Sequence, residues 1–180
     1  MADYSFDRLN VLLIDDNAYM RKLLHTLLVG LGFNSIQEAE DGAEGLDLLK
    51  SYAADLAIVD WEMPQFDGIE FTQMVRNAPD SPNRFLPIIM LSGHAELNRV
   101  LQARDAGINE YLTKPVSAQR LYRAIVSLIE RPRKFITANN YFGPDRRFRD
   151  GADYKGTKRR ESDEQGEKAL TQDEIEAMFA

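Results

Sequence analysis

The sequence of 180 residues contains no cysteine, which excludes disulfide bonds and thiolate metal sites. It has no apolar run near the roughly 20 residues that a membrane-spanning helix needs. The first ten residues lack the basic and apolar regions of a secretory signal. These absences predict a cytoplasmic protein without membrane insertion. The length leaves room for one ordinary domain and a substantial additional segment.

Charge is distributed unevenly along the chain. Residues 1–130 carry 11 Lys and Arg against 19 Asp and Glu, residues 131–160 carry 10 against 3, and residues 161–180 carry 1 against 7. The corresponding net charges are −8, +7 and −6. Arg131-Pro132 would also end a helix at the first boundary. The pattern predicts a domain at residues 1–130. It is followed by a linker tail at residues 131–169, first basic and aromatic and then acidic, and by a short amphipathic helix at residues 170–180.

Five short apolar runs alternate with five segments of helical periodicity within residues 1–130. The run at residues 56–60 is apolar on both faces up to Asp60, which is typical of a strand buried inside a parallel sheet. Alternating strands and helices joined by right-handed crossovers build a sheet between two helix layers. We therefore expect a doubly wound α/β fold with a five-stranded parallel sheet and five helices, followed by a mostly irregular tail.

Polar groups follow four of the predicted strands: Asp15 and Asp16, Asp60, Ser92, and Lys114. The carboxyl ends of parallel strands share one edge, where open α/β folds bind their ligands. Three carboxylates would converge there, and like charges are costly unless a cation neutralises them. Mg²⁺ suits such a set. Each group alone has another explanation, as a helix cap or a solvated loop end, but the match at four strand ends favours a common site.

These residues resemble the CheY-like receiver domains of two-component response regulators, over roughly residues 8–130. The resemblance rests on a spaced set: Asp15-Asp16, Asp60, Met63-Pro64, Asp67-Gly68, Ser92, Tyr111 and Lys114-Pro115. It implies a flavodoxin-like fold that accepts a phosphoryl group from a histidine kinase or phosphotransfer protein. Such a protein is a signalling switch rather than an enzyme. A scaffold that is not phosphorylated is disfavoured, because the site residues are all present.

The resemblance also implies how the metal would be held. Asp60 would be the nucleophile. Asp16, Asp60 and the backbone carbonyl of Glu62 would bind Mg²⁺ directly, and Asp15 would act through coordinated water. Glu62 and His94 would flank the approach of the water that removes the phosphoryl group.

The remaining motif residues would read out the phosphoryl group. Lys114 would neutralise one phosphoryl oxygen and Ser92 would donate a hydrogen bond to another. The Lys114-Pro115 bond is expected to be cis. Tyr111 would turn inward when Ser92 moves, biasing an output surface made by the fourth helix, fifth strand and fifth helix. A half-exposed strand tyrosine without such a role is the alternative.

Residues 131–160 combine basic and aromatic side chains, a mixture that can bind nucleic acid. A transcription or RNA regulator is therefore the alternative function. The same segment can instead pack on the acidic domain or remain a solvated linker. We favour packing or a linker, because no helical reading element is present.

The last eleven residues predict a helix that binds a surface. Residues 171–174 match a capping box, and Leu170 with Ile175 has hydrophobic-staple spacing. Ile175, Met178 and Phe179 form a one-sided apolar stripe, and so short a helix is marginal alone. Residues 170–178 also look like the N-terminal peptide of the flagellar switch protein FliM, which docks on the output face of phosphorylated chemotaxis receivers. A generic terminal helix is the alternative. The likeness favours chemotaxis or motility, and contact between the tail and its own or a neighbouring receiver.

Overall fold

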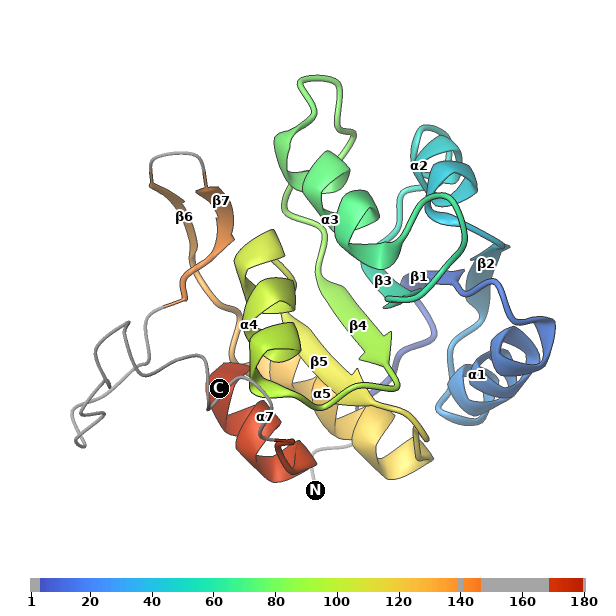
Figure 1. Cartoon of the computed structure of the whole chain (residues 1–180). Coiled ribbons are helices and arrows are strands. Elements are labelled where there is room, and N and C mark those ends of the chain that lie inside the picture. The colour runs from blue at the N-terminus through green and yellow to red at the C-terminus, as the bar shows by residue number, and fades with distance from the viewer. Residues whose placement is uncertain (1–3, 139–140, 147–168, 180) are drawn as a thin grey trace.

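The computed structural model describes residues 4–138, 141–146 and 169–179. Residues 147–168 of the predicted linker tail and the last residue of the predicted terminal helix lie outside the described residues. Five strands form one parallel sheet in the order β2-β1-β3-β4-β5. They are β1 (Asn10–Ile14), β2 (Ser35–Ala39), β3 (Leu56–Asp60), β4 (Ile88–Ser92) and β5 (Glu110–Thr113). The predicted doubly wound fold is confirmed (Figure 1).

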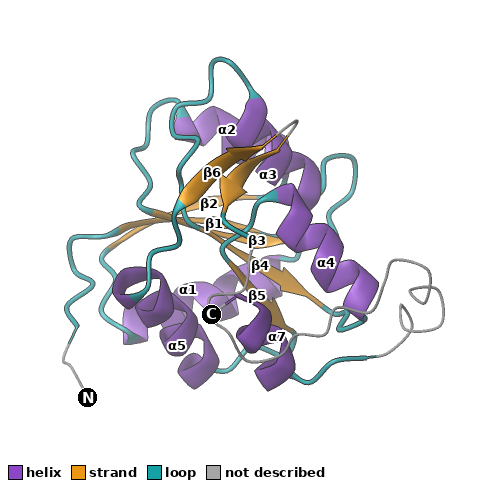
Figure 2. Cartoon of the chain, turned by 90° about the vertical axis from the view of Figure 1, so that its left-hand side faces the viewer, coloured by secondary structure: helices purple, strands orange, loops and turns teal. Residues whose placement is uncertain are grey.

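Two helix layers cover the sheet (Figure 2). One layer holds α1 (Ala18–Gly30) and α5 (Ala118–Glu130), and the other holds α2 (Gly42–Leu49), α3 (Gly68–Asn77) and α4 (Leu97–Ala106). Successive residues of a strand point to opposite faces. In β1, therefore, Val11 and Leu13 pack with the first layer while Leu12 and Ile14 pack with the second. The apolar residues of β1, β3 and β4 are buried on both faces because both faces are covered, whereas β2, at one edge of the sheet, is partly exposed.

The turn between β3 and α3 needs a glycine. Gly68 lies so close to the end of β3 that a Cβ atom there would meet the carbonyl oxygen of Asp60 at 2.3 Å. Asp67 caps α3 through a capping box with Glu70, which fixes where the helix begins. The segment that follows Asp60 is therefore held close against the strand end.

After α5 the chain forms an antiparallel hairpin that the sequence pattern did not predict. It consists of β6 (Phe135–Ala138) and β7 (Tyr141–Pro144). Phe135 and Phe142 both lie 5.2 Å from the ring of Phe85, and the guanidinium of Arg84 lies 3.7 Å from the ring of Phe142. This part of the basic and aromatic segment thus packs on the domain.

The terminal helix α7 (Gln172–Phe179) lies against β5, the edge strand of the sheet (Figure 1). The predicted capping box is present, because the Thr171 N–H donates to Glu174 at 2.8 Å and the Glu174 N–H donates to Thr171 Oγ1 at 3.3 Å. Among the described residues, no helix is long and apolar enough to cross a membrane.

Candidate functional site

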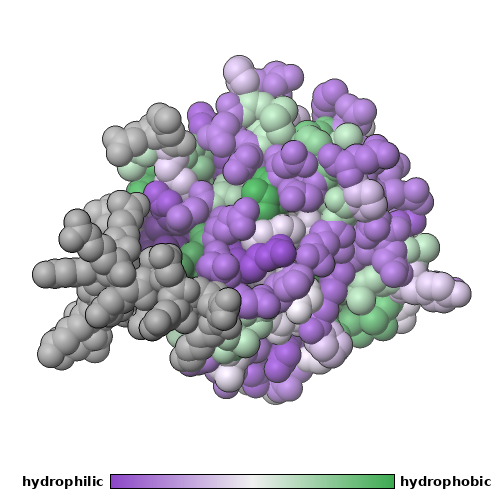
Figure 3. All heavy atoms as spheres, viewed as in Figure 1, coloured by the Kyte–Doolittle hydropathy of each residue, from purple (hydrophilic) through white to green (hydrophobic). Residues whose placement is uncertain are grey.

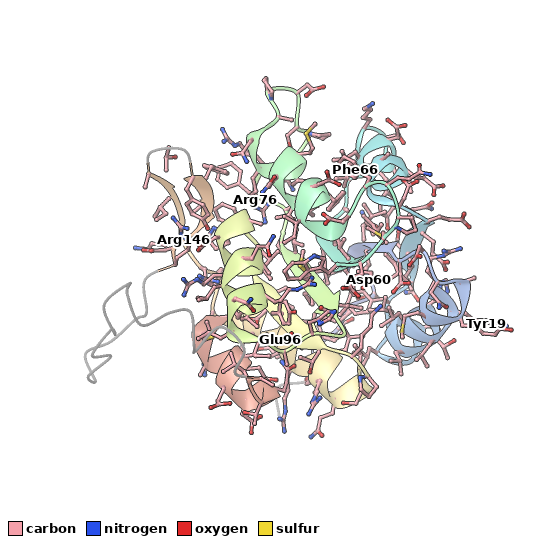
Figure 4. All side chains as sticks on the ribbon, in the orientation of Figure 1. Tyr19, Asp60, Phe66, Arg76, Glu96 and Arg146 are labelled. Carbon is pink, nitrogen blue, oxygen red and sulfur yellow. The ribbon has the colours of Figure 1, made fainter. Side chains whose placement is uncertain are left out.

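The carboxyl edge of the sheet brings the predicted acidic residues together. Asp60 ends β3 and Asp15 directly follows β1, and both are buried, with 5% and 0% of their surface exposed. Asp16 is exposed beside them. One carboxylate oxygen from each of the three residues lies within 4.8 Å of the others. Figure 4 shows Asp60 at this edge, between α1 and the end of β4.

Lys114, which directly follows β5, bridges two of these carboxylates. Its Nζ lies 2.9 Å from Asp60 Oδ1 and 3.1 Å from Asp15 Oδ2. The Lys114–Pro115 peptide bond is cis, as the resemblance implies. The backbone N–H of Asn17 donates to the other Asp15 oxygen at 2.9 Å. Asp15 is therefore oriented from two sides while Asp60 keeps one oxygen without a hydrogen bond to Lys114.

Burial and crowding determine the charge of the site. Burial raises the pKa of Asp60 to about 6, although Lys114 acts in the opposite direction, and the charges of Asp15 and Asp16 raise it further. Burial lowers the pKa of Lys114, but its bonds and proximity to Asp60 and Asp15 outweigh this and raise it overall. One ammonium group faces three carboxylates. The donor set therefore fits a hard divalent cation such as Mg²⁺, which prefers carboxylate oxygens and keeps several waters.

Ser92 ends β4 beside this cluster, because the Lys114 N–H donates to its backbone oxygen at 2.7 Å, and Ser92 and Tyr111 both contact the loop that follows β4. Both are fully buried, so the alternative of a half-exposed Tyr111 is wrong. The Tyr111 hydroxyl donates to the backbone oxygen of His94 at 2.7 Å, and the His94 N–H donates to Ser92 Oγ at 3.1 Å. Burial raises the pKa of Tyr111 to about 12, so the phenol stays protonated and able to donate. The ring meets Trp61 edge to face, at 6.3 Å between centroids.

A charged rim surrounds the entrance to the site. His94 Nε2 lies 2.8 Å from Glu62 Oε1, and His94 Nδ1 lies 3.4 Å from Glu96 Oε2. Arg99 lies 3.7 Å from Glu62 and 5.0 Å from the ring of Trp61. The sequence had singled out Glu62 and His94 separately. No motif predicted that Glu62 and His94 form an ion pair, or that Arg99 contacts Glu62 and Glu96 contacts His94.

The predicted tail residues meet the rest of the domain at β5, between α4 and α5. Ile175 and Phe179 are buried, and Leu170 and Met178 are partly buried against the same apolar cluster. Gln172 also contacts β5, which the sequence pattern did not predict. It lies three residues before Ile175 and seven before Phe179, so all three share one face of the helix. That spacing is the signal that could have identified it.

Comparison with known proteins agrees with this geometry. Residues 11–126 match the response regulator receiver domain family. The chemotaxis protein CheY-3 of Vibrio cholerae is 35% identical over 123 residues, which cover 68% of this chain and 93% of that protein. The chemotaxis protein CheY of Pseudomonas aeruginosa is 36% identical over 123 residues, covering 68% and 98%.

A solved structure gives the same result for the fold. The crystal structure of a response regulator receiver domain protein from Clostridium thermocellum superposes with a TM-score of 0.61 at 30% identity. The match covers 68% of this chain and 95% of that one. The similarity therefore spans the sheet and its two helix layers.

Proposed function

The chain belongs to the response regulator receiver domain family, and from this premise we propose that it is a phosphorylation-switched response regulator that accepts a phosphoryl group on Asp60. The observation that carries the proposal is the cluster of Asp15, Asp16 and Asp60 with Lys114 between two of them. A sensor histidine kinase or a phosphotransfer protein would supply the phosphoryl group. The chain would act as a signalling switch and not as a classical enzyme.

Asp60 is the proposed nucleophile. A carboxylate oxygen attacks the phosphorus atom of the donor, and the bond between phosphorus and the donor's nitrogen or oxygen breaks with its electron pair on the leaving group. Because the transition state of such transfers is loose, alignment and charge neutralisation carry the catalysis. Lys114, already 2.9 Å from Asp60, would neutralise one phosphoryl oxygen as a compact charge. Ser92 would donate a hydrogen bond to another phosphoryl oxygen.

Asp15, Asp16 and Asp60 are the side chains that would hold Mg²⁺, together with the backbone carbonyl of Glu62. Bound Mg²⁺ would offset the negative charge that the carboxylates and the phosphoryl oxygens bring together. The residues of the chain would do the rest. Asn17 and Lys114 orient Asp15, and the burial of Asp60 keeps bulk water from the nucleophile.

The proposed output surface is the face formed by α4, β5 and α5. Ser92 and Tyr111 would relay the state of Asp60 to it through the His94 loop that both contact. A downstream protein would bind there. The similarity to proteins named for chemotaxis and the FliM-like sequence of the tail favour a role in motility. Packing of Phe135 and Phe142 on Phe85 favours a structural role over nucleic-acid binding for this part of the tail.

The proposal is tested by incubating the purified chain with radiolabelled acetyl phosphate, with Mg²⁺ or with a chelator. We expect the acid-precipitated wild-type protein to carry label only when Mg²⁺ is present. Asp60→Asn should carry no label under either condition. Asp41→Asn is the matched control, because it makes the same chemical change at a helix cap where Asn serves equally well. A wild-type chain that takes up no label, or an Asp60→Asn chain that labels normally, contradicts the proposal.

A further inference from the structure

Residues 169–179 occupy the face that we propose for output. Ile175 and Phe179 are buried in the same cluster as Tyr111 of β5 and Val100 of α4. The guanidinium of Arg133, in the segment after α5, lies 5.7 Å from the ring of Phe179. Where Figure 3 draws the surface in colour, it is mostly hydrophilic. The buried side chains of α7 thus cover apolar residues of this face.

Gln172 attaches α7 to the open edge of the sheet. In the part of the chain that the structure describes, β5 has no strand beside its outer edge, so that edge presents unpaired backbone groups. Gln172 Oε1 accepts from the Thr113 N–H and from Thr113 Oγ1, both at 2.9 Å, and Gln172 Nε2 donates to the backbone oxygen of Tyr111 at 3.0 Å. One primary amide therefore replaces the donor and acceptor of a missing strand. A glutamate has no donor for the Tyr111 oxygen, so it could not make both bonds.

The residues before α7 hold the loop that follows Ser92. The Leu170 N–H donates to the backbone oxygen of Ala95 at 2.7 Å, and Ala169 bridges with Glu96. The same loop carries His94, which contacts both Ser92 and Tyr111. One end of the tail segment thus contacts the loop after Ser92, and Gln172 contacts the strand that leads into Lys114.

The buried position of Tyr111 belongs to this arrangement. Its hydroxyl donates to the backbone oxygen of His94, in the same loop whose Ala95 oxygen accepts from the Leu170 N–H, and its own backbone oxygen accepts from Gln172 Nε2. The tail segment thus holds both the loop and the strand that fix the buried Tyr111. A seated α7 and an inward Tyr111 therefore favour each other. Any ligand that prefers one of two states shifts the equilibrium toward it, and the coupling is reciprocal.

We propose that α7 is a resident ligand of its own α4–β5–α5 face, and that its seating through Gln172 is coupled to phosphorylation of Asp60. This coupling rests on the proposed function, whereas the seating does not. A downstream partner must displace α7. The partner helix that fits presents a glutamine amide to the β5 edge, with apolar side chains three and seven residues after it.

The first experiment measures whether the face is occupied. A fluorescein-labelled peptide of residues 169–180 is titrated with the full-length chain, and binding is followed by anisotropy. We expect the peptide to bind Ile175→Asp and Gln172→Ala, in which the resident helix is weakened, and to bind the wild-type chain at least about tenfold more weakly. Asp173→Ala is the matched control, because Asp173 is exposed on the same turn of α7, and it should behave as wild type. Equal binding to wild type and both weakened variants would overturn the proposal, as would binding to none of them.

The second experiment measures the coupling. Beryllofluoride with Mg²⁺ imitates the phosphoryl group, and we expect it to raise the affinity of the peptide for Ile175→Asp about fivefold or more. An unchanged affinity in a chain whose Asp60 is still labelled by acetyl phosphate refutes the coupling and leaves the proposed function intact. Absence of labelling refutes the proposed function and therefore the coupling, while the first experiment still decides the seating. Sedimentation should give a monomer, and a dimer lost in Ile175→Asp would overturn seating within one chain.

Discussion

We expect Glu110 to make the stability of this protein dependent on pH. This residue of β5 is buried, with 6% of its surface exposed, and it lines a cavity of about 410 Å³ between α5 and α7. Burial raises the pKa of Glu110 to about 7. The Ser127 hydroxyl and Arg133 act in the opposite direction, and the charge of Glu176 on α7 raises it further.

The sign of the effect follows from the raised pKa. The folded chain binds the Glu110 proton more tightly than the unfolded chain does, whose carboxyl has an ordinary pKa near 4.5. The associated stability is complete below pH 4.5 and is lost as the pH rises through about 7. At about 1.4 kcal/mol per pH unit, the whole interval corresponds to about 3 kcal/mol. Glu110→Gln keeps a neutral polar side chain at every pH and so escapes this loss.

We therefore expect Glu110→Gln to match wild type near pH 4.5 and to exceed its free energy of unfolding by up to about 3 kcal/mol at pH 8. Urea unfolding followed by circular dichroism at several pH values gives both curves. Glu130→Gln, at the exposed rim of the same cavity, is the matched control, and its difference from wild type should not vary in this way. A Glu110→Gln difference that is the same at pH 5 and pH 8 would refute the reasoning.

Three further substitutions test the site and its support. Asp16→Asn removes an exposed carboxylate of the cluster and should weaken Mg²⁺ binding at least about tenfold, measured by fluorescence of the neighbouring Trp61; equal affinity would exclude Asp16 as a ligand. Gly68→Ala places a Cβ 2.3 Å from the Asp60 carbonyl oxygen and should cost about 1–3 kcal/mol in urea unfolding and slow labelling of Asp60; unchanged stability would contradict the close approach. Arg76→Met leaves four oxygen atoms without the guanidinium that now binds them, and it should lower the free energy of unfolding by about 2–4 kcal/mol; a neutral effect would show that water replaces the side chain.

The sheet and the carboxylate cluster could be predicted because their signals are local. Each central strand is a short apolar run, and the run at residues 56–60 ends at Asp60. Parallel topology then places all the strand ends at one edge. Asp15, Asp60 and Lys114 meet there without any further information about packing.

The hairpin and the contacts of α7 depend on partners far away in the sequence. β6 and β7 have four residues each, too short for a clear periodicity, although the two-residue spacing between them is typical of a hairpin. Their packing partner Phe85 comes about fifty residues earlier in the chain. Gln172 meets Thr113 only because α7 lies in one register along β5, and no local pattern specifies that register.

The burial of Arg76 is a second case of this kind. Its side chain is fully buried, and it binds three backbone oxygens and Asn109 Oδ1 near the hairpin (Figure 4). Burial lowers its pKa to about 9. The sequence gives no sign that this helix residue is buried, because the oxygens that bind it come from two separate loops, one before β4 and one before β5.

The central claim is that Asp60 itself receives the phosphoryl group. The direct measurement treats the chain with acetyl phosphate and Mg²⁺, reduces it with borohydride, which converts an aspartyl phosphate to homoserine, and maps the modified peptide by mass spectrometry. We predict conversion at Asp60 and at neither Asp15 nor Asp16. Conversion at another carboxylate, or none at any, would contradict the account.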